Sequence, residues 1–261
     1  MNGYLLPAAT FVFLVVFGRA LYGLGAGSLR PGRLTLISMT LGFGLLTADL
    51  WIRGQALRGC PLNSLFDVLI FLSWSVVLIY LLIGPAYRLS LLGSFTSGLV
   101  LIVLLAAQLL PIRRAPAEPV SRDAWVEFHA ALSLVAYGAF ALAGLAGFMY
   151  LLQDRQLKQR KAGKLFYNLP PVTDLAVANA RLVWLGFGLL TISFAAGIIS
   201  GMPVNTVKFW TSLVIWFVYA GVLALRQFRS LAPRRVAVLS MAVFAAALLA
   251  LPAIQYLSSP R

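Results

Sequence analysis

Long apolar runs separated by short polar segments cover the chain from its start to its end. A helix that crosses a bilayer needs about 20 apolar residues. Because a backbone exposed to lipid must satisfy its own hydrogen bonds, such runs predict helices, and we therefore expect an all-α, polytopic membrane protein with about eight transmembrane helices. The predicted spans are Leu5–Leu24, Leu34–Ile52, Leu65–Gly84, Leu91–Leu110, Phe128–Leu152, Leu182–Gly201, Phe209–Leu225 and Val236–Tyr256.

The segments between these spans are too short to form a second domain. The longest connections are Pro111–Glu127 and Gln153–Arg181. Composition agrees, because 61% of the residues are hydrophobic and only 11% are charged, whereas a soluble domain holds about 25% charged residues. We expect residues 1–261 to form a single integral membrane domain with no soluble domain.

The net charge of +14 informs the prediction of membrane orientation more than the prediction of binding partners. In a soluble protein it would indicate nucleic acid, but here the basic residues flank apolar runs, where they set orientation and contact anionic lipid. With the N-terminus outside, fourteen Lys and Arg lie inside and seven outside. We therefore predict a multi-pass protein of the bacterial cytoplasmic (inner) membrane, with both termini outside, lipid as a partner and no nucleic acid.

One histidine, His129, stands at the start of the fifth predicted span, on the outer side. Ser133 and Tyr137 follow at intervals of four and share its helix face. Neutral imidazole binds metals and haem iron through one nitrogen, although a histidine at a membrane interface can also be merely accommodated by headgroups. A lone histidine cannot supply two axial ligands. The lone cysteine, Cys60, excludes an intrachain disulfide and a CxxC pair.

Two carboxylates fall at the outer ends of the second and third spans. Ionisable groups in spans are costly and often functional. However, Asp49 and Asp67 lie close in sequence to Arg53 and Arg58, and Asp67 lies in the first turn of a predicted helix, where the helix dipole favours a negative charge. A structural salt bridge or a helix cap is therefore the favoured interpretation.

Aromatic and small residues leave two interpretations open. Tryptophans near the outer surface (Trp51, Trp74, Trp125, Trp210 and Trp216) are typical of an interfacial aromatic belt, or they could form a platform for a porphyrin. Small residues in the fifth and sixth spans permit close helix packing in lipid, or a tight bundle around a flat ligand. These small residues are Gly138, Ala139, Ala143, Gly144, Gly147, Gly186, Gly188, Ala195, Ala196 and Gly197.

Four segments, in chain order, carry the motifs of one membrane-protein family. Arg58–Tyr80 has Gly-x-Pro-Leu, where the family has Gly-x-x-Pro-Leu, followed by an acid, Asp67, and by Phe-Leu-x-Trp. His129–Lys158 begins with the histidine and ends Tyr-Leu-x-Gln-x-Arg-x-Leu-Lys, and Asn168–Gly201 and Lys208–Arg226 follow with their own motifs. Together they resemble the cytochrome c assembly family of the CcsA/ResC type, and most of all its shorter YpjD and HemX relatives.

The chain also departs from the full members of that family. Their tryptophan-rich loop ends Trp-Asp-Pro-Lys-Glu, where this chain has Asn205–Phe209 and keeps only Lys208. Ala224 replaces a membrane histidine, and a further outer histidine does not follow. His129 matches the family's first outer histidine.

The resemblance implies a membrane subunit of cytochrome c biogenesis that binds or handles haem at the outer face. It implies His129 as a ligand of the haem iron, Trp125, Tyr137 and Trp210 as pocket walls, and Lys208 as a propionate partner. In the family, attachment needs a second assembly subunit and an apocytochrome c with a CxxCH motif. We do not expect this chain to be an enzyme by itself, because the tryptophan-rich loop is missing.

Two other functions remain open at this point. A membrane scaffold or regulator of the HemX/YpjD kind would use the inner loop Gln153–Arg181 and the basic turn Arg226–Arg235 to meet a soluble partner. A small transporter is disfavoured, because the sequence has neither an inverted repeat nor a matching pair of interrupted helices.

Overall fold

The computed structural model describes residues 3–26, 33–62, 64–84, 91–109, 123–160, 169–201, 207–229 and 231–258. These ranges hold eight helices and no strand, so the all-α prediction is confirmed. Seven of them, α1 to α5, α7 and α8, are long and apolar enough to cross a membrane; the span predicted in α9 stays a prediction. The helices are α1 (Leu5–Ala26), α2 (Arg33–Leu57), α3 (Leu65–Ile83), α4 (Leu92–Leu109), α5 (Ala124–Lys158), α7 (Val172–Ile199), α8 (Val207–Arg229) and α9 (Pro233–Ser258).

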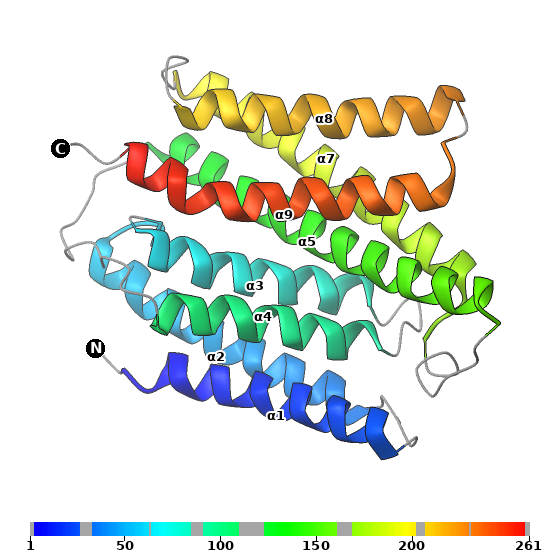
Figure 1. Ribbon diagram of the computed structural model, residues 1–261. Coiled ribbons are helices and arrows are strands. Elements are labelled where there is room, and N and C mark those ends of the chain that lie inside the picture. Colours follow the sequence, from blue (N-terminus) through cyan, green and yellow to red (C-terminus); the bar gives the residue numbers. More distant parts are fainter. Residues whose placement is uncertain are drawn as a thin grey trace.

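Successive helices run in opposite directions along one bundle (Figure 1). Helices α1 to α4 pack among themselves, as do α5, α7, α8 and α9, and the contact between α3 and α5 joins the two groups. The starts of α1, α3, α5 and α8 lie at the left in Figure 1. We call this the histidine end, because His129 lies near the start of α5, and the opposite end the basic end.

Helix α5 is the centre of the bundle, with α7, α9 and α3 packed against it. Glycines permit this close approach. A Cβ added at Gly138 would lie 2.8 Å from the carbonyl carbon of Ser75 on α3, and one at Gly147 would lie 2.8 Å from the carbonyl oxygen of Ala237 on α9. Neither neighbour is a flexible side-chain tip, so these glycines serve helix packing.

A buried amide and a ring stack fix the C-terminal group of helices. Asn179 of α7, only 2% exposed, donates from Nδ2 to the carbonyl oxygen of Ala143 on α5 at 2.6 Å and to Oγ of Ser240 on α9 at 2.8 Å. Phe140 of α5 stacks on Tyr219 of α8, with ring centroids 3.7 Å apart. Hydrogen bonds between helices are specific in apolar surroundings, so these contacts set the positions of α7, α8 and α9 around α5.

The observed connections on either side of α5 are shorter than those predicted from the sequence. Helix α5 starts at Ala124 and ends at Lys158, and α7 starts at Val172, so much of Gln153–Arg181 and the end of Pro111–Glu127 are helical. The reason is local. The Asp123 carboxylate caps α5 by accepting from the backbone N–H of Trp125, and Lys158 pairs with Asp154 at 2.7 Å one turn away. Such pairs continue a helix beyond the apolar span.

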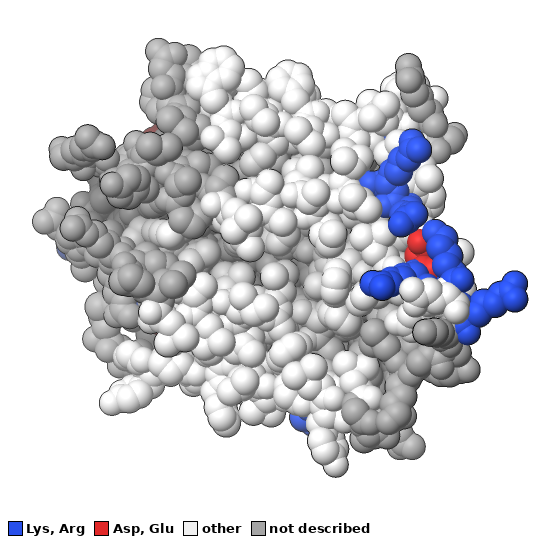
Figure 2. Space-filling view, in the orientation of Figure 1, with Lys and Arg blue, Asp and Glu red and all other residues white. Residues whose placement is uncertain are grey.

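The basic end carries a cluster of positive side chains. Figure 2 shows lysine and arginine gathered at that end around an acidic group, while the lateral face in view is mostly uncharged. Arg155 and Lys158 lie in the last turn of α5, and the Asp154 carboxylate lies 3.7 Å from Nε of Arg234 on α9. Of the residues predicted for the inner loop, Lys161 and Lys164 lie outside the described ranges.

Candidate functional site

His129 lies in the second turn of α5 and turns its ring toward α7. Its Nδ1 is 2.6 Å from the backbone carbonyl oxygen of Ser193. A carbonyl oxygen only accepts, so Nδ1 carries a proton, and in the neutral imidazole Nε2 then holds the lone pair. Within the described part of the chain no hydrogen bond reaches Nε2. The ring is only partly buried. A neutral imidazole with one nitrogen fixed and the other available is the form that binds a metal.

Two hydroxyl groups hold this arrangement in place. Ser193, which is fully buried, has its Oγ 2.9 Å from the backbone oxygen of His129 and 2.6 Å from Oγ of Ser133. The single hydroxyl proton of Ser193 goes to the His129 carbonyl, so Ser133 is the donor to Ser193. The backbone and the side chain of His129 are thus both tied to one residue of α7. Such contacts behind a ligating histidine fix its tautomer and ring direction.

A glycine makes room for the ring. A Cβ added at Gly197 would lie 2.9 Å from Nδ1 of His129 and 3.1 Å from its Cε1, so a larger residue would push the ring away. Ser193 and Gly197 are four residues apart and therefore share one face of α7. Sequence reasoning placed Ser133 on the face of His129 but missed Ser193, and it noted Gly197 only as a small residue. The four-residue spacing of Ser193 and Gly197, which places both on one helix face, was the signal in the sequence that could have grouped them.

Trp210, a predicted pocket wall, is connected to the same corner of the bundle. Its ring packs edge-on against Phe209, with centroids 5.8 Å apart, and Phe209 packs edge-on against Phe194 at 6.2 Å. Phe194 follows Ser193 directly in α7. Trp210 is 58% exposed, so it offers an open aromatic surface close to the residue that holds His129.

The other predicted site residues are placed differently. Trp125 lies one turn before His129, is 47% exposed and packs edge-on against Phe128. Tyr137 lies two turns deeper in α5, where its side chain interacts with Ser212 of α8. Lys208 is in the first turn of α8, and its side chain lies outside what the structure describes. His129, Ser133, Ser193 and Gly197 therefore form the site. Trp125 lies one turn away on α5, and Trp210 is linked to α7 through Phe209 and Phe194.

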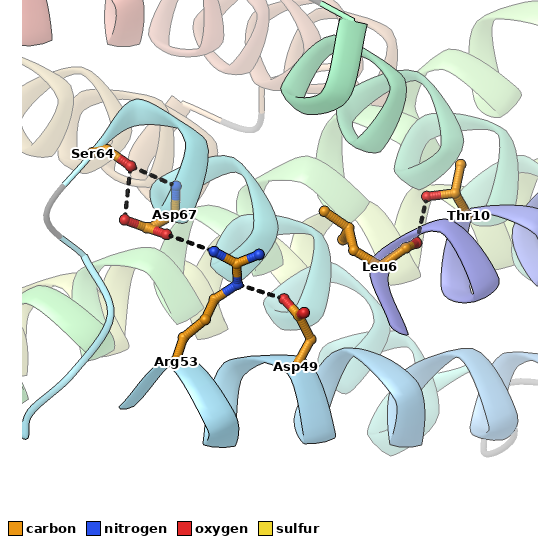
Figure 3. Close-up of polar contacts among 6 residues, drawn as sticks. All are labelled: Leu6, Thr10, Asp49, Arg53, Ser64 and Asp67. Atoms are coloured by element: carbon orange, nitrogen blue, oxygen red, sulfur yellow. Dashed lines mark hydrogen bonds and ion pairs between the residues drawn. The ribbon is translucent and has the colours of Figure 1, made fainter. Parts of the chain in front are cut away.

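A second polar cluster joins α2 to α3 at the same end (Figure 3). Nε of Arg53 lies 2.7 Å from Oδ2 of Asp49, and its Nη1 lies 3.7 Å from Oδ1 of Asp67. Ser64 caps α3, with its hydroxyl accepting from the Asp67 backbone N–H and donating to the Asp67 carboxylate at 2.7 Å. Both carboxylates are buried. The structural interpretation of Asp49 and Asp67 is confirmed, and Arg53 is the arginine that both of them contact.

Glu127 ties the start of α5 to the connection between α2 and α3. Its Oε1 accepts a hydrogen bond from the backbone N–H of Cys60 at 3.1 Å, and the same oxygen touches the position of a Cβ at Gly59. Glu127 lies two residues before His129 in α5. Glu127 therefore links the helix that carries His129 to the connection that leads from α2 into α3.

The donor set around His129 limits what it can bind. Within the described ranges no three His, Cys, Asp or Glu residues come together in a way that would hold a metal ion. A single neutral nitrogen can bind an iron whose other ligands come from a porphyrin, because the ring supplies four of them. The site thus fits one axial ligand of a haem and does not fit a bare structural zinc.

Comparisons with known proteins identify the family of the chain. The family model described as cytochrome C assembly protein matches residues 62–259. The protein HemX of Brevibacillus brevis is 33% identical over 179 residues, which is 65% of each chain and so just under two thirds of HemX. The cytochrome c biogenesis protein CcsA of a Synechococcus strain is 27% identical over 90% of this chain and 86% of its own. CcsA of Gloeobacter violaceus is 26% identical over 92% of this chain and 89% of its own. This multi-pass membrane protein therefore belongs to the cytochrome c assembly protein family.

Proposed function

We propose that this chain is a haem-handling membrane subunit of cytochrome c biogenesis and that His129 is an axial ligand of the haem iron. The observation that carries the proposal is the 2.6 Å contact between Nδ1 of His129 and the carbonyl oxygen of Ser193. In the neutral imidazole that contact leaves Nε2 unprotonated, which is the state that iron requires. Haem supplies an iron that accepts this nitrogen and a flat apolar ring that suits an aromatic surface.

The surrounding residues have defined roles in this proposal. Ser193 and Ser133 hold the imidazole, and Gly197 leaves space for it. The exposed rings of Trp125 and Trp210 offer apolar surface to a porphyrin, Tyr137 borders the site from deeper in the bundle, and Lys208 pairs with a propionate. The proposed partners are a second assembly subunit and an apocytochrome c.

The proposed location is the bacterial cytoplasmic membrane, with the histidine end and both termini outside. The excess of Lys and Arg supports it, because such residues concentrate on the cytoplasmic side. Arg155, Lys158, Arg160, Arg234 and Arg235 lie in or next to the ends of α5 and α9 at the basic end. Haem would then be handled at the outer face, where c-type cytochromes are completed in this proposal.

Visible spectra of the detergent-purified protein test the function directly. Wild type supplied with haem is expected to show a Soret band and sharp reduced α and β bands. His129→Ala is expected to lose them while keeping its helical circular dichroism and its elution volume. Added imidazole should partly restore the bands in His129→Gly. Equal spectra for wild type and His129→Ala would refute the proposal.

The scaffold function remains the alternative, and the similarity to HemX and the basic end (Figure 2) favour it specifically. In that case a soluble acidic partner would bind at the basic end, and His129 would be dispensable. Charge reversal at Lys158, Arg160 and Lys161 should then abolish function in a complementation assay, while His129→Ala should not. The opposite pattern would exclude the scaffold.

A further inference from the structure

A surface pocket of about 580 Å³ opens at the histidine end, between α2, α3 and their connection. Its walls are mostly apolar and aromatic, with Trp51, Phe71 and Trp74 as the large rings. Trp74 is held in place, because its Nε1 donates to Oγ1 of Thr47 at 2.9 Å and its ring stacks on Phe43. Trp51 by contrast is 68% exposed. The pocket is separate from the His129 site.

The pocket runs along the membrane normal rather than across it. Its lining on α2 and just beyond extends from Thr47 to Arg58, which is about 16 Å at the rise of a helix. That length is about half of the roughly 30 Å hydrocarbon core, so it corresponds to one leaflet. The polar lining residues Gln55 and Arg58 lie toward its outer end and are exposed.

The charge of the lining is one-sided. Among the described residues that line the pocket, Arg58 is the only charged one. The nearby Asp49 and Asp67 are taken up by Arg53, whereas no described ion pair involves Arg58. The pocket therefore has one positive group at headgroup depth and rings below it.

Arg58 also has a backbone conformation that a glycine would adopt more easily. It ends α2 with φ of 51°, and the backbone N–H of Gly59 donates to the carbonyl of Gly54 at 3.2 Å. This is the usual place of a C-terminal glycine, and side chains rarely adopt positive φ. An arginine here places a long cationic side chain in the lining of the pocket at some cost in backbone strain.

We propose that this pocket binds an anionic phospholipid from the leaflet at the histidine end. The phosphate would pair with Arg58 and Gln55, and one acyl chain would lie against Trp51, Phe71 and Trp74. The lining holds no His, Cys, Met or Tyr, so it offers haem iron no side-chain ligand. The one-leaflet length favours a lipid over a free anion.

Tryptophan quenching by brominated lipids tests the site in reconstituted vesicles. In phosphatidylcholine vesicles, brominated phosphatidylglycerol should quench wild type at an about fivefold lower mole fraction than brominated phosphatidylcholine, because one arginine near anionic lipid contributes about that factor. Arg58→Gly suits the local backbone, so it should fold, and it should bring the ratio close to one. Arg58→Lys should keep most of the preference.

Arg160→Gly is the matched control, because Arg160 has the same φ of 51° and lies at the opposite end. It should leave the ratio unchanged. Equal quenching by the two lipids in wild type, or equal losses in Arg58→Gly and Arg160→Gly, would overturn the site. Relief of quenching by millimolar inorganic phosphate would also overturn it, since the pocket would then recognise a free anion rather than a lipid.

Discussion

Two polar clusters lie at the same end of the bundle and differ in whether each of their polar groups has a partner. In the Asp49–Arg53–Asp67 cluster, the arginine reaches both carboxylates and Ser64 bonds to one of them. In the His129 site, one ring nitrogen is fixed by Ser193 and the other has no hydrogen bond within the described residues. Buried polar groups that are all paired hold helices together. A ring nitrogen without a hydrogen bond, on a rigidly held imidazole, is suited to binding a ligand.

The largest expected loss of stability comes from removing the arginine of the Asp49–Arg53–Asp67 cluster. Arg53→Leu leaves Asp49 and Asp67 buried without their cation, and breaking a buried ion pair in this way costs about 3–5 kcal/mol. The variant also loses the cation–π contact in which Cζ of Arg53 lies 4.9 Å from the centroid of the Phe66 ring. We expect most of the folded protein to be lost, measured by unfolding in mixed SDS micelles followed by circular dichroism.

Removing all three charges separates charge from packing. The triple variant Arg53→Leu, Asp49→Leu, Asp67→Asn should regain most of the stability, because a buried ion cluster replaced by groups of similar volume is often neutral. A triple variant as unstable as Arg53→Leu would mean that the cluster acts through shape and not through charge balance.

These two clusters also show what the sequence could predict. Asp49, Arg53 and Asp67 were recognisable because their partners are near in sequence and the i,i+4 spacing is local. Ser193 lies 64 residues from His129, and no local rule connects them, since the packing of α5 on α7 creates the contact. In the same way the apolar runs predicted the helices, whereas Asp123 and Asp154 extended α5 past its apolar run.

Glu127 tests the link between the start of α5 and the connection from α2 to α3. Glu127→Ala removes the acceptor of the Cys60 N–H, and a hydrogen bond to a charged group contributes about 1.5–3 kcal/mol. Since Glu127 is partly exposed, we expect the lower part of that range in the SDS titration. Glu127→Gln, which keeps an acceptor, should lose less. Equal losses would show that the carboxylate acts through another contact.

A substitution at Gly197 tests the His129 site without removing a polar group. Gly197→Ala places a methyl 2.9 Å from Nδ1 of His129 and should displace the ring from Ser193. Loss of a supporting contact to a metal ligand costs about 10–100-fold in affinity, so haem titrations should weaken by that factor. Gly188→Ala is the control in the same helix, because a Cβ there meets nothing within 4 Å. Equal affinities for the two variants would contradict the proposed orientation of His129.

Ser193→Ala should have the smallest effect of the series, because the group that fixes the tautomer is the backbone carbonyl of Ser193, which remains. The hydroxyl contacts with the His129 carbonyl, with Ser133 and, at 3.1 Å, with Nδ1 of His129 are lost, and net contributions of this kind are about 0.5–1.5 kcal/mol. We expect a modest loss of stability in the SDS titration and less than about tenfold in haem affinity. If Ser193→Ala instead removed haem binding as completely as His129→Ala, the hydroxyl and not the carbonyl would be the group that holds Nδ1.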